Sequence, residues 1–371
     1  MPGTKTNRRK AHVPWGWILA SGLAAAALIL FYALRTVPGF ADGFSARVSA
    51  PLRRALGAVS APVPFSVMEF LYAAGVILLL SFLALTVRRV LVSRGRRLAV
   101  LGRRVLALAL AAVYIWLGYC WLWGIDYYAA DFRTRSGLKA DGASVEELTA
   151  VTAYFAAQAN EWAPQVRRDA GGHYAEDLDA LFAGYDGLYD LIEADFPFLS
   201  GVSRRPKQMV FSRIMSYMGF TGIYFPFTGE SNINTDPPAA TMPATIAHEL
   251  AHQRGVAKEQ EANFVGILAC ARSADPAYRY AGYLLGLTYL SNALYQASPG
   301  AWAELSVELC AEIRTDWQDS NDYWAALQTP VREVSEKVYD GYLKAQGQDL
   351  GIRSYGACVD LLVAYFLPEA A

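Results

Sequence analysis

Residues 243–252 read PATIAHELAH, a stretch that carries two of the four histidines in the chain. On a helix, residues four apart share a face, so His248 and His252 can present two imidazoles to one metal ion. A proline is tolerated in a first helical turn, so the helix can begin at Thr241 or Pro243. The stretch therefore predicts a helix that supplies two ligands of a metal site.

Glu249 follows the first histidine of this pair and is rotated away from the face that carries both imidazoles. It can approach a water molecule at the metal without binding the metal itself. Zinc acidifies and holds such a water, and a glutamate in this position accepts its proton, which is how the His-Glu-x-x-His pattern supports hydrolysis. The alternative is a chance match on a helix that only packs its histidines. The small apolar neighbours and the carboxylates that follow favour a metal site.

A catalytic zinc site needs a third protein ligand and an open position for water. Glu259 and Glu261 are the candidates, because Gly255 can end the first helix and let a second one begin soon after it. Glu259 and Asn263 then share a face, as in the Glu-x-x-x-Asp pattern of gluzincin peptidases, where Glu binds zinc and the later residue supports a ligand histidine. We favour Glu259, and Glu261 remains the alternative. Lys258 occupies the third-histidine position of the metzincin pattern, which excludes that class.

A short stretch rich in Phe, Tyr, Ile, Gly and Thr precedes the histidines, at residues 206–235. Within it, residues 222–228 predict a strand, and their proline permits the strand only at the edge of a sheet. In gluzincin-like enzymes an edge strand beside the active helix pairs with the extended substrate. Gly222, Tyr224 and Phe225 are therefore candidate substrate-binding residues, and a plain core strand is the alternative.

Further polar residues can serve such a site. Residues 229–238 predict a turn, because they combine Gly, Asn, Asp and two prolines. Glu230, Asn232 and Asn234 within it either belong to that turn or line the cleft. A transition-state oxyanion also needs a donor besides the metal. Tyr355 is the candidate for this role, and Tyr224 is the alternative.

The composition of the chain is too apolar for a wholly soluble protein. Hydrophobic residues make up 54% of the 371-residue chain and charged residues only 18%. A bilayer core needs about 20 consecutive apolar residues in a helix. Such runs cover residues 15–34, 65–87 and 105–125, and a cleaved signal peptide is the alternative for the first run. We therefore predict three transmembrane helices.

Basic residues predict the orientation of these helices. Seven arginines lie between residues 88 and 104, in the loop between the second and third apolar runs. The positive-inside rule places this loop and the N-terminus in the cytoplasm. Residues 1–125 then form a multi-pass anchor in the cell membrane, residues 126–143 a linker, and residues 144–371 an extracytoplasmic domain. The net charge of −1 argues against a nucleic-acid partner.

The domain after the linker has a helical pattern. Ser144 and Glu147 form a capping-box signature that opens a helix running to about residue 167. Further helices are expected at residues 176–194, 277–297, 300–317, 330–345 and 354–366. The fold class is therefore mainly α, with three transmembrane helices and a predominantly helical, zincin-like domain that has a small edge-strand region. The sequence leaves the disulfide status of Cys270, Cys310 and Cys358 open.

Over nearly its whole length, the chain resembles a bacterial membrane family known as domain of unknown function 3810. Residues 222–232, 248–253 and 259–264 carry the resemblance. That family looks like three membrane spans followed by a gluzincin-like domain. The resemblance therefore implies the same topology and metal site, but it implies no substrate.

Together these patterns predict a membrane-anchored, zinc-dependent peptidase that acts on a peptide or protein, with Glu249 as general base. The alternative is a catalytically silent binding or assembly protein that keeps a structural zinc, for which an intact Glu249 would be unnecessary. A transporter is disfavoured because the apolar runs contain few polar residues. The sequence does not determine the oligomeric state.

Overall fold

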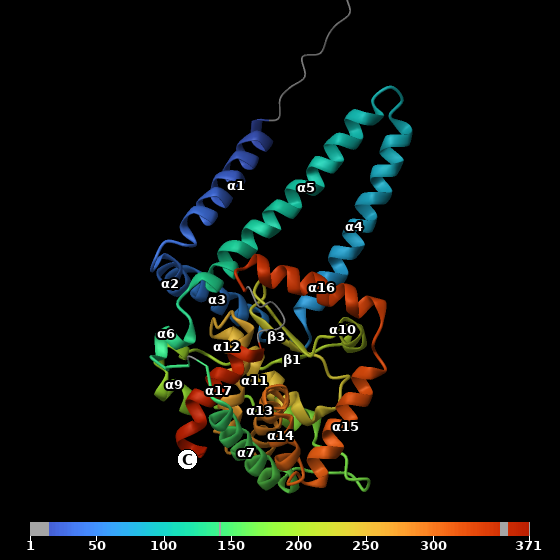
Figure 1. Ribbon diagram of the computed structural model, residues 1–371. Helices are drawn as coiled ribbons and strands as arrows, with labels where there is room; N and C mark the ends of the chain where they lie inside the picture. Colours follow the sequence, from blue (N-terminus) through green and yellow to red (C-terminus); the bar gives the residue numbers. More distant parts are fainter. Residues whose placement is uncertain (1–14, 141, 349–354, 371) are drawn as a thin grey trace, which may run out of the picture.

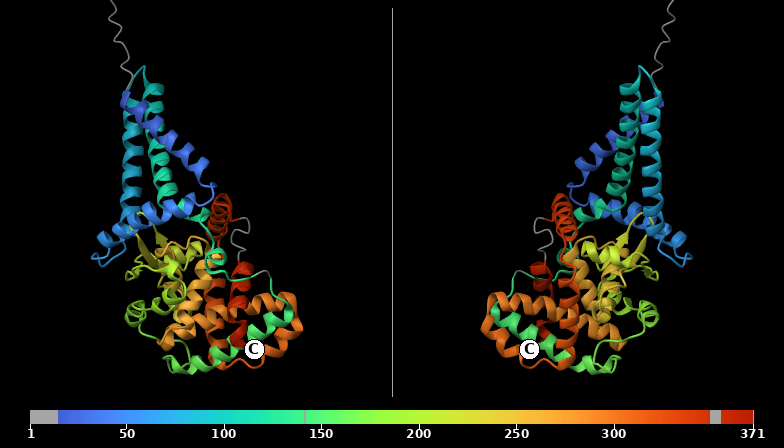
Figure 2. Two further views of the ribbon diagram at one scale, coloured as in Figure 1. Left: turned by 90° about the vertical axis from the view of Figure 1, so that its left-hand side faces the viewer. Right: turned by 90° about the vertical axis from the view of Figure 1, so that its right-hand side faces the viewer.

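Helices dominate the structure, a computed structural model that describes residues 15–140, 142–348 and 355–370. Three long helices rise from one end of a helical body (Figures 1 and 2). These are α1 (Trp15–Leu34), α4 (Val67–Val92) and α5 (Arg97–Leu122). The prediction of a mainly α-helical protein with a small sheet is confirmed.

Two of the long helices, α4 and α5, are long and apolar enough to cross a membrane, and very little of either is buried inside the protein. A core helix of a soluble protein would be mostly buried. The expectation of three spans is corrected to two by this measure. The apolar part of α1 covers only Ile18–Leu34, which as a helix is about 26 Å long and shorter than a bilayer core of about 30 Å.

The segment between α1 and α4 adds structure that the sequence patterns did not predict. It holds α2 (Phe40–Phe44), the π-helical turn η1 (Ser45–Ser49) and α3 (Ala50–Ser60). Arg53 of α3 is buried and forms an ion pair with Asp126, with 2.6 Å between the guanidinium and carboxylate atoms. A buried charge pair therefore holds α3 to the segment that follows α5.

The expected linker, residues 126–143, packs against the protein rather than standing free. It includes most of the 3₁₀ helix η2 (Gly124–Tyr128) and the short helix α6 (Phe132–Ser136). The Phe132 side chain is buried in the main hydrophobic core, where its ring packs against Phe264 with 5.0 Å between centroids.

The core of the body is a bundle of packed helices. Its members are α7 (Val145–Trp162), α11 (Met242–Gln253), α12 (Glu259–Ala271), α13 (Pro276–Ala297) and α17 (Tyr355–Ala370). The expected capping box begins α7, because Ser144 and Glu147 each accept the other's backbone N–H. Gly266 lets α12 approach α11 closely, since a β-carbon there would lie 2.9 Å from the backbone nitrogen of His248. All four cysteines are free.

Two expected helices are each divided into two. Residues 176–194 form α8 (Leu178–Ala183) and then α9 (Asp190–Asp195), separated by a turn in which Gly187 has a φ of +70°. Residues 300–317 fall into α14 (Pro299–Ser306) and α15 (Ala311–Ala325). The remaining helices are η3 (Ala163–Gln165), η4 (Pro197–Leu199), α10 (Ser212–Met218), η5 (Ala239–Thr241) and α16 (Pro330–Ala345).

The sheet has three short strands in the order β1-β3-β2. They are β1 (Lys207–Gln208), β2 (Gly222–Phe225) and β3 (Glu230–Ile233). The strand β2 lies at the edge as predicted, antiparallel to β3, and β1 is parallel to β3. The predicted turn at residues 229–238 is wrong for β3, which is the buried central strand. Each of its polar side chains makes at least one hydrogen bond there, although Asn232 Oδ1 has no partner among the described residues. The Ser231 hydroxyl, for example, donates to the Glu249 carbonyl at 2.9 Å.

Candidate metal centre

The helix α11 presents His248 and His252 on one face, with 4.7 Å between the ring centroids. The helix ends at Gln253, and Gly255 has a φ of +90°, a backbone conformation that favours glycine. This turn allows α12 to begin at Glu259 and to pack back against α11. The expected break between two helices therefore brings the start of α12 to the histidines.

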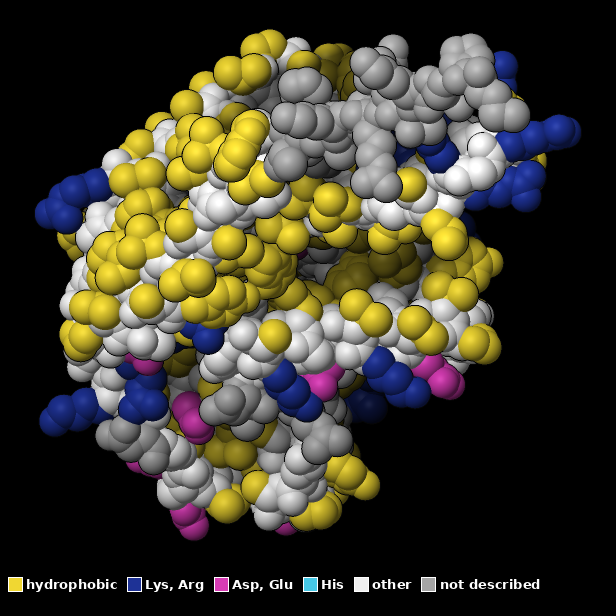
Figure 3. Space-filling model, turned by 90° about the horizontal axis from the view of Figure 1, so that it is seen from above, with side chains coloured by type: hydrophobic (Ala, Val, Ile, Leu, Met, Phe, Trp, Pro, Cys, Tyr) yellow, Lys and Arg dark blue, Asp and Glu magenta, His cyan; other side chains and the backbone are white. Residues whose placement is uncertain are grey.

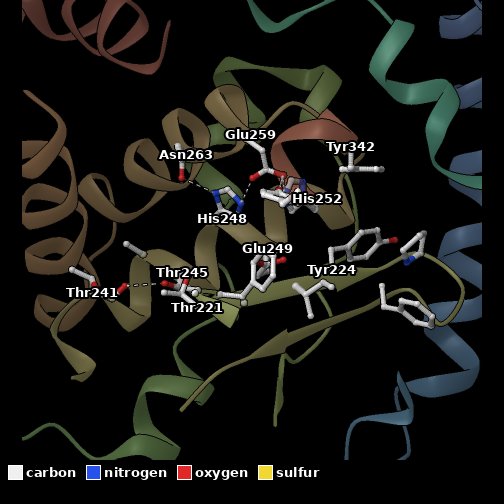
Figure 4. A pocket seen from close by; sticks show the side chains of 18 of the residues that line it. Thr221, Tyr224, Thr241, Thr245, His248, Glu249, His252, Glu259, Asn263 and Tyr342 are labelled. Atoms are coloured by element: carbon white, nitrogen blue, oxygen red, sulfur yellow. Dashed lines mark hydrogen bonds and ion pairs between the residues drawn. The ribbon is translucent and has the colours of Figure 1, made fainter. Parts of the chain in front are cut away.

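His248, His252 and Glu259 each offer one ligand atom, and these atoms lie within 4.8 Å of one another. The nearer Glu259 oxygen is 3.3 Å from His248 Nε2, and the other is 3.8 Å from His252 Nε2. Figure 4 shows the three side chains converging. Glu261 is not part of this group, because its carboxylate lies 3.6 Å from the ammonium of Lys258.

Hydrogen bonds hold each of the three side chains in place. Asn263 Oδ1 lies 2.9 Å from His248 Nδ1, and the Val256 carbonyl lies 2.6 Å from His252 Nδ1. Both partners are acceptors, so the Nδ1 atoms carry hydrogen and the Nε2 atoms face the cluster. The Tyr339 hydroxyl donates to Glu259 at 2.7 Å.

Charge and burial set the protonation of the cluster. Burial lowers the pKa of His252 to about 4, so this imidazole is neutral near pH 7. Burial disfavours the charge on Glu259, but the hydrogen bond from His248 and the two imidazoles outweigh it and lower the Glu259 pKa to about 2. Burial likewise opposes a charge on His248, yet the Glu259 carboxylate raises the His248 pKa. A cation bound between these side chains would replace the proton that His248 shares with Glu259.

Glu249 is buried between the histidine face of α11 and the strand β2 (Figure 4). Its Oε2 has no hydrogen-bond partner within the described part of the chain. Burial raises the Glu249 pKa to about 8, partly offset by His248 and by the backbone N–H of Tyr224. A β-carbon on Gly222 would lie 2.6 Å from Glu249 Oε1, so only glycine fits beside this carboxylate.

A cleft of about 1480 Å³ opens over the cluster. All three expected strand residues, Gly222, Tyr224 and Phe225, line it, whereas the side chain of Tyr355 lies outside the described residues. The wall of the cleft also includes tyrosines that the sequence did not single out, among them Tyr289, Tyr339 and Tyr342. Nothing in their local sequence distinguishes them from the other tyrosines of the chain, which number 22 in all.

Comparison with known proteins places the chain in a family but gives no relative of known activity. No curated protein and no solved structure matches it. One family model matches residues 44–363, which include α4, α5, the sheet and the histidine cluster. Because this match covers most of its length, the chain belongs to the family described as "Protein of unknown function (DUF3810)".

Proposed function

We propose that the chain is a membrane-anchored, zinc-dependent peptidase. The observation that carries the proposal is the convergence of His248, His252 and Glu259 beside the unpaired carboxylate oxygen of Glu249. Two imidazoles and one carboxylate are a donor set that catalytic zinc sites use, with a fourth position left for water. The neutral His252 and the ionised Glu259 are already in the protonation states that binding requires.

When bound, zinc would supply a Lewis acid that polarises the scissile carbonyl and makes the attacking water more acidic. Glu249 takes one proton from that water while the water oxygen bonds to the carbonyl carbon. The carbon–nitrogen bond then breaks, and Glu249 passes the proton to the departing amine. The raised pKa of Glu249 suits a group that must hold a proton briefly, and a nearby dication would lower that pKa again.

The edge strand β2 supports a peptide as the substrate. One side of β2 pairs with β3, and within the described residues its other side has no strand partner. An extended peptide can add to such an edge through main-chain hydrogen bonds. Tyr224 projects beside the cluster, with its ring centroid 6.3 Å from that of His252, and is the candidate donor to an oxyanion.

The helices α4 and α5 support an anchor of defined orientation. They form a hairpin whose arginine-rich connection lies at the end farthest from the body (Figure 1). Under the positive-inside rule this connection is cytoplasmic, and the body with its cleft is then outside the cytoplasm. The expected cytoplasmic N-terminus stays a prediction, because residues 1–14 lie outside the described residues.

Glu249→Gln is the decisive test. The change keeps the size of the side chain and removes the base, so zinc should stay near one per chain by elemental analysis. Hydrolysis of an unfolded probe such as carboxymethylated casein should fall by roughly 10²–10⁴-fold.

Cells should be compared in parallel, because a test protein can be a poor substrate. Cells with Glu249→Gln should match a deletion strain. If they match wild type while His248→Ala cells match the deletion, the metal is structural and the protein is a scaffold.

A further inference from the structure

We propose that the substrate is a membrane-inserted polypeptide: its apolar segment enters from the bilayer between α4 and α5, and its adjoining outer segment reaches Glu249. This inference rests on the peptidase function proposed above and adds the class of substrate. It is carried by the course of the cleft, the chemistry of its walls and the position of β2.

The cleft does not end at the body but continues between the two candidate membrane helices. From α4 and α5 it is lined by Leu71, Tyr72, Gly75, Val76, Leu79, Ala112, Ile115, Trp116 and Tyr119. The α4 members recur every three or four residues and so form one stripe on that helix. From Leu71 to Leu79 this stripe is about 12 Å long, which is more than a third of a bilayer core. The same cavity also includes His248 and Glu249.

The walls of this membrane part suit an apolar occupant. None of the α4 and α5 residues that line it is charged. Val76 and Ile115 are exposed by 56% and 65%, so their side chains face whatever fills the groove. A β-carbon on Gly75 would have no atom within 4 Å, which leaves the groove open at mid-height.

The shape of the hairpin gives access from the side. In Figure 1, α4 and α5 meet near their arginine-rich connection and diverge toward the body. Figure 3 looks down on this end of the molecule, where hydrophobic side chains gather around a hollow. A segment in the bilayer can therefore enter between the helices without first leaving the lipid.

The body is suited to lie on the membrane surface beside this opening. Val331, Val334 and Val338 of α16 are exposed and share one face of the helix. Tyr339 and Tyr342 of the same helix line the cleft next to that face. An amphipathic helix with this pattern lies in the interface with its apolar face toward lipid. The metal cluster is thereby kept close to the bilayer.

The hairpin of β2 and β3 joins the groove to the cluster. Phe225 of β2 packs against Tyr72 of α4, with 5.5 Å between ring centroids. Phe227 fills the space beside Gly118 of α5, where a β-carbon would lie 3.2 Å from its ring. The edge of β2 therefore starts where the membrane groove ends and runs to Glu249. A polypeptide can pair with this edge, whereas a lipid chain would leave its backbone groups unpaired.

The test uses two sets of synthetic peptides with the same randomised ten-residue segment. One set carries this segment on the outer side of a Leu-Ala membrane-spanning helix, and the other set carries it on a polar tail. Wild-type protein in liposomes, loaded with zinc, should cut the span-bearing set at least about tenfold faster, because burial of even one large apolar side chain is worth that factor. Products are identified by mass spectrometry.

Gly75→Trp fills the groove and should lower cleavage of the span-bearing set by at least about tenfold. Gly102→Trp is the control on the other helix of the hairpin: Gly102 lies on α5, likewise has no atom near its β-carbon position, and does not line the cleft. The Gly102→Trp protein should cleave the span-bearing set at the wild-type rate.

A second readout does not depend on hydrolysis. A photo-reactive phenylalanine replaces either Leu79, which lines the groove, or its exposed neighbour Leu80, which does not. In the Glu249→Gln background the span-bearing peptides should cross-link to position 79 and not to position 80. Gly75→Trp should remove that cross-link.

The outcomes separate the two proposals. Equal cleavage of both peptide sets, with no effect of Gly75→Trp, overturns entry from the bilayer and leaves the peptidase standing. Cross-links to lipid alone at position 79 overturn it in favour of a lipid occupant. Specific cross-linking to the span-bearing peptides without any cleavage by wild type supports the groove as a binding site and overturns the peptidase.

Discussion

Gly222 and Glu249 meet where β2 passes α11, and the space between them admits no side chain. A β-carbon on Gly222 would lie 2.6 Å from Glu249 Oε1 and 2.9 Å from its Cγ. Gly222→Ala should therefore push the carboxylate aside and lower hydrolysis by roughly 10²-fold, the usual effect of a displacement of about 1 Å at a catalytic group. The rate is measured on the most rapidly cut peptide.

The control is Gly300→Ala, because a β-carbon at Gly300 meets no atom within 4 Å. Zinc content should stay near one per chain in both variants. An unchanged rate in Gly222→Ala would mean that Glu249 does not have to hold its observed position.

The carboxylates of Glu259 and Glu261 should differ in their effect on zinc. Glu259 faces both imidazoles, whereas Glu261 is paired with Lys258. Glu259→Ala should weaken zinc binding by more than the roughly 10–100-fold that follows loss of a ligand's hydrogen-bond partner. Glu261→Ala should have a much smaller effect. Titration against a chelating dye measures the zinc affinity of both variants. A larger loss of affinity in Glu261→Ala than in Glu259→Ala would make Glu261 the third ligand.

Zinc binding should also weaken as the pH is lowered. The Glu259 carboxylate raises the pKa of His248, so His248 binds its proton more tightly than an isolated imidazole. Zinc must displace that proton, and its affinity should fall as the pH drops through the His248 pKa. An affinity that does not change between pH 8 and pH 5 would exclude His248 as a ligand.

At the scale of residues, spacing along the chain predicted most of the cluster. His248, His252, Glu259 and Asn263 lie on two consecutive helices, so their relative positions follow from helix geometry and one glycine turn. Tyr339 could not be found in this way. It comes from α16, 80 residues away from Glu259, and its contact exists only because the chain returns to the cleft.

At the scale of elements, the start of α4 depends on a buried carboxylate. Glu230 of β3 accepts the backbone N–H groups of Val67 and Met68 and lies 3.6 Å from the ammonium of Lys207. Glu230→Ala leaves both the helix end and a buried ammonium without their partner. It should destabilise the protein by about 3–5 kcal/mol, the range for breaking a buried ion pair.

Thermal unfolding of the full chain in detergent measures this effect, with the exposed Glu304→Ala as control. Equal melting temperatures for the two variants would show that the sheet does not hold α4 in place.

The strand β3 also explains one error in the prediction from the sequence. A strand with Glu230, Ser231 and Asn232 looks like a turn, because polar residues usually avoid a buried sheet. Here each of the three side chains has hydrogen-bond partners, including the start of α4 and the backbone of α11. The start of α4 and the backbone of α11 are separated from β3 in the chain, so no pattern within the strand reveals these partners. By contrast, α16 was predicted with its correct bounds, because Thr329 and Pro330 mark its start.

At the scale of the whole molecule, the arrangement of charges predicts the orientation in the membrane. Alkaline phosphatase, which is active only outside the cytoplasm, should be active when fused after Ala371. The same enzyme inserted at Gly95, in the arginine-rich connection, should be inactive. The opposite pattern would place the cleft in the cytoplasm.

The overall architecture was only partly accessible from the sequence. Apolar runs located α4 and α5, because bilayer thickness sets a length that hydropathy can detect. The packing of residues 40–60 and 126–143 around the base of α5 was not predicted. It depends on the pairing of Arg53 with Asp126, two charges 73 positions apart in the chain.

The strand β2 is only four residues long, from Gly222 to Phe225. A peptide paired with it would advance about 13 Å from the groove to the carboxylate. If the membrane groove holds one end of the substrate, the length of β2 sets how many residues separate the lipid boundary from the bond that is cut. Proteins with unrelated sequences would then be cut at the same height above the bilayer, and selectivity would be a matter of distance rather than of side-chain identity.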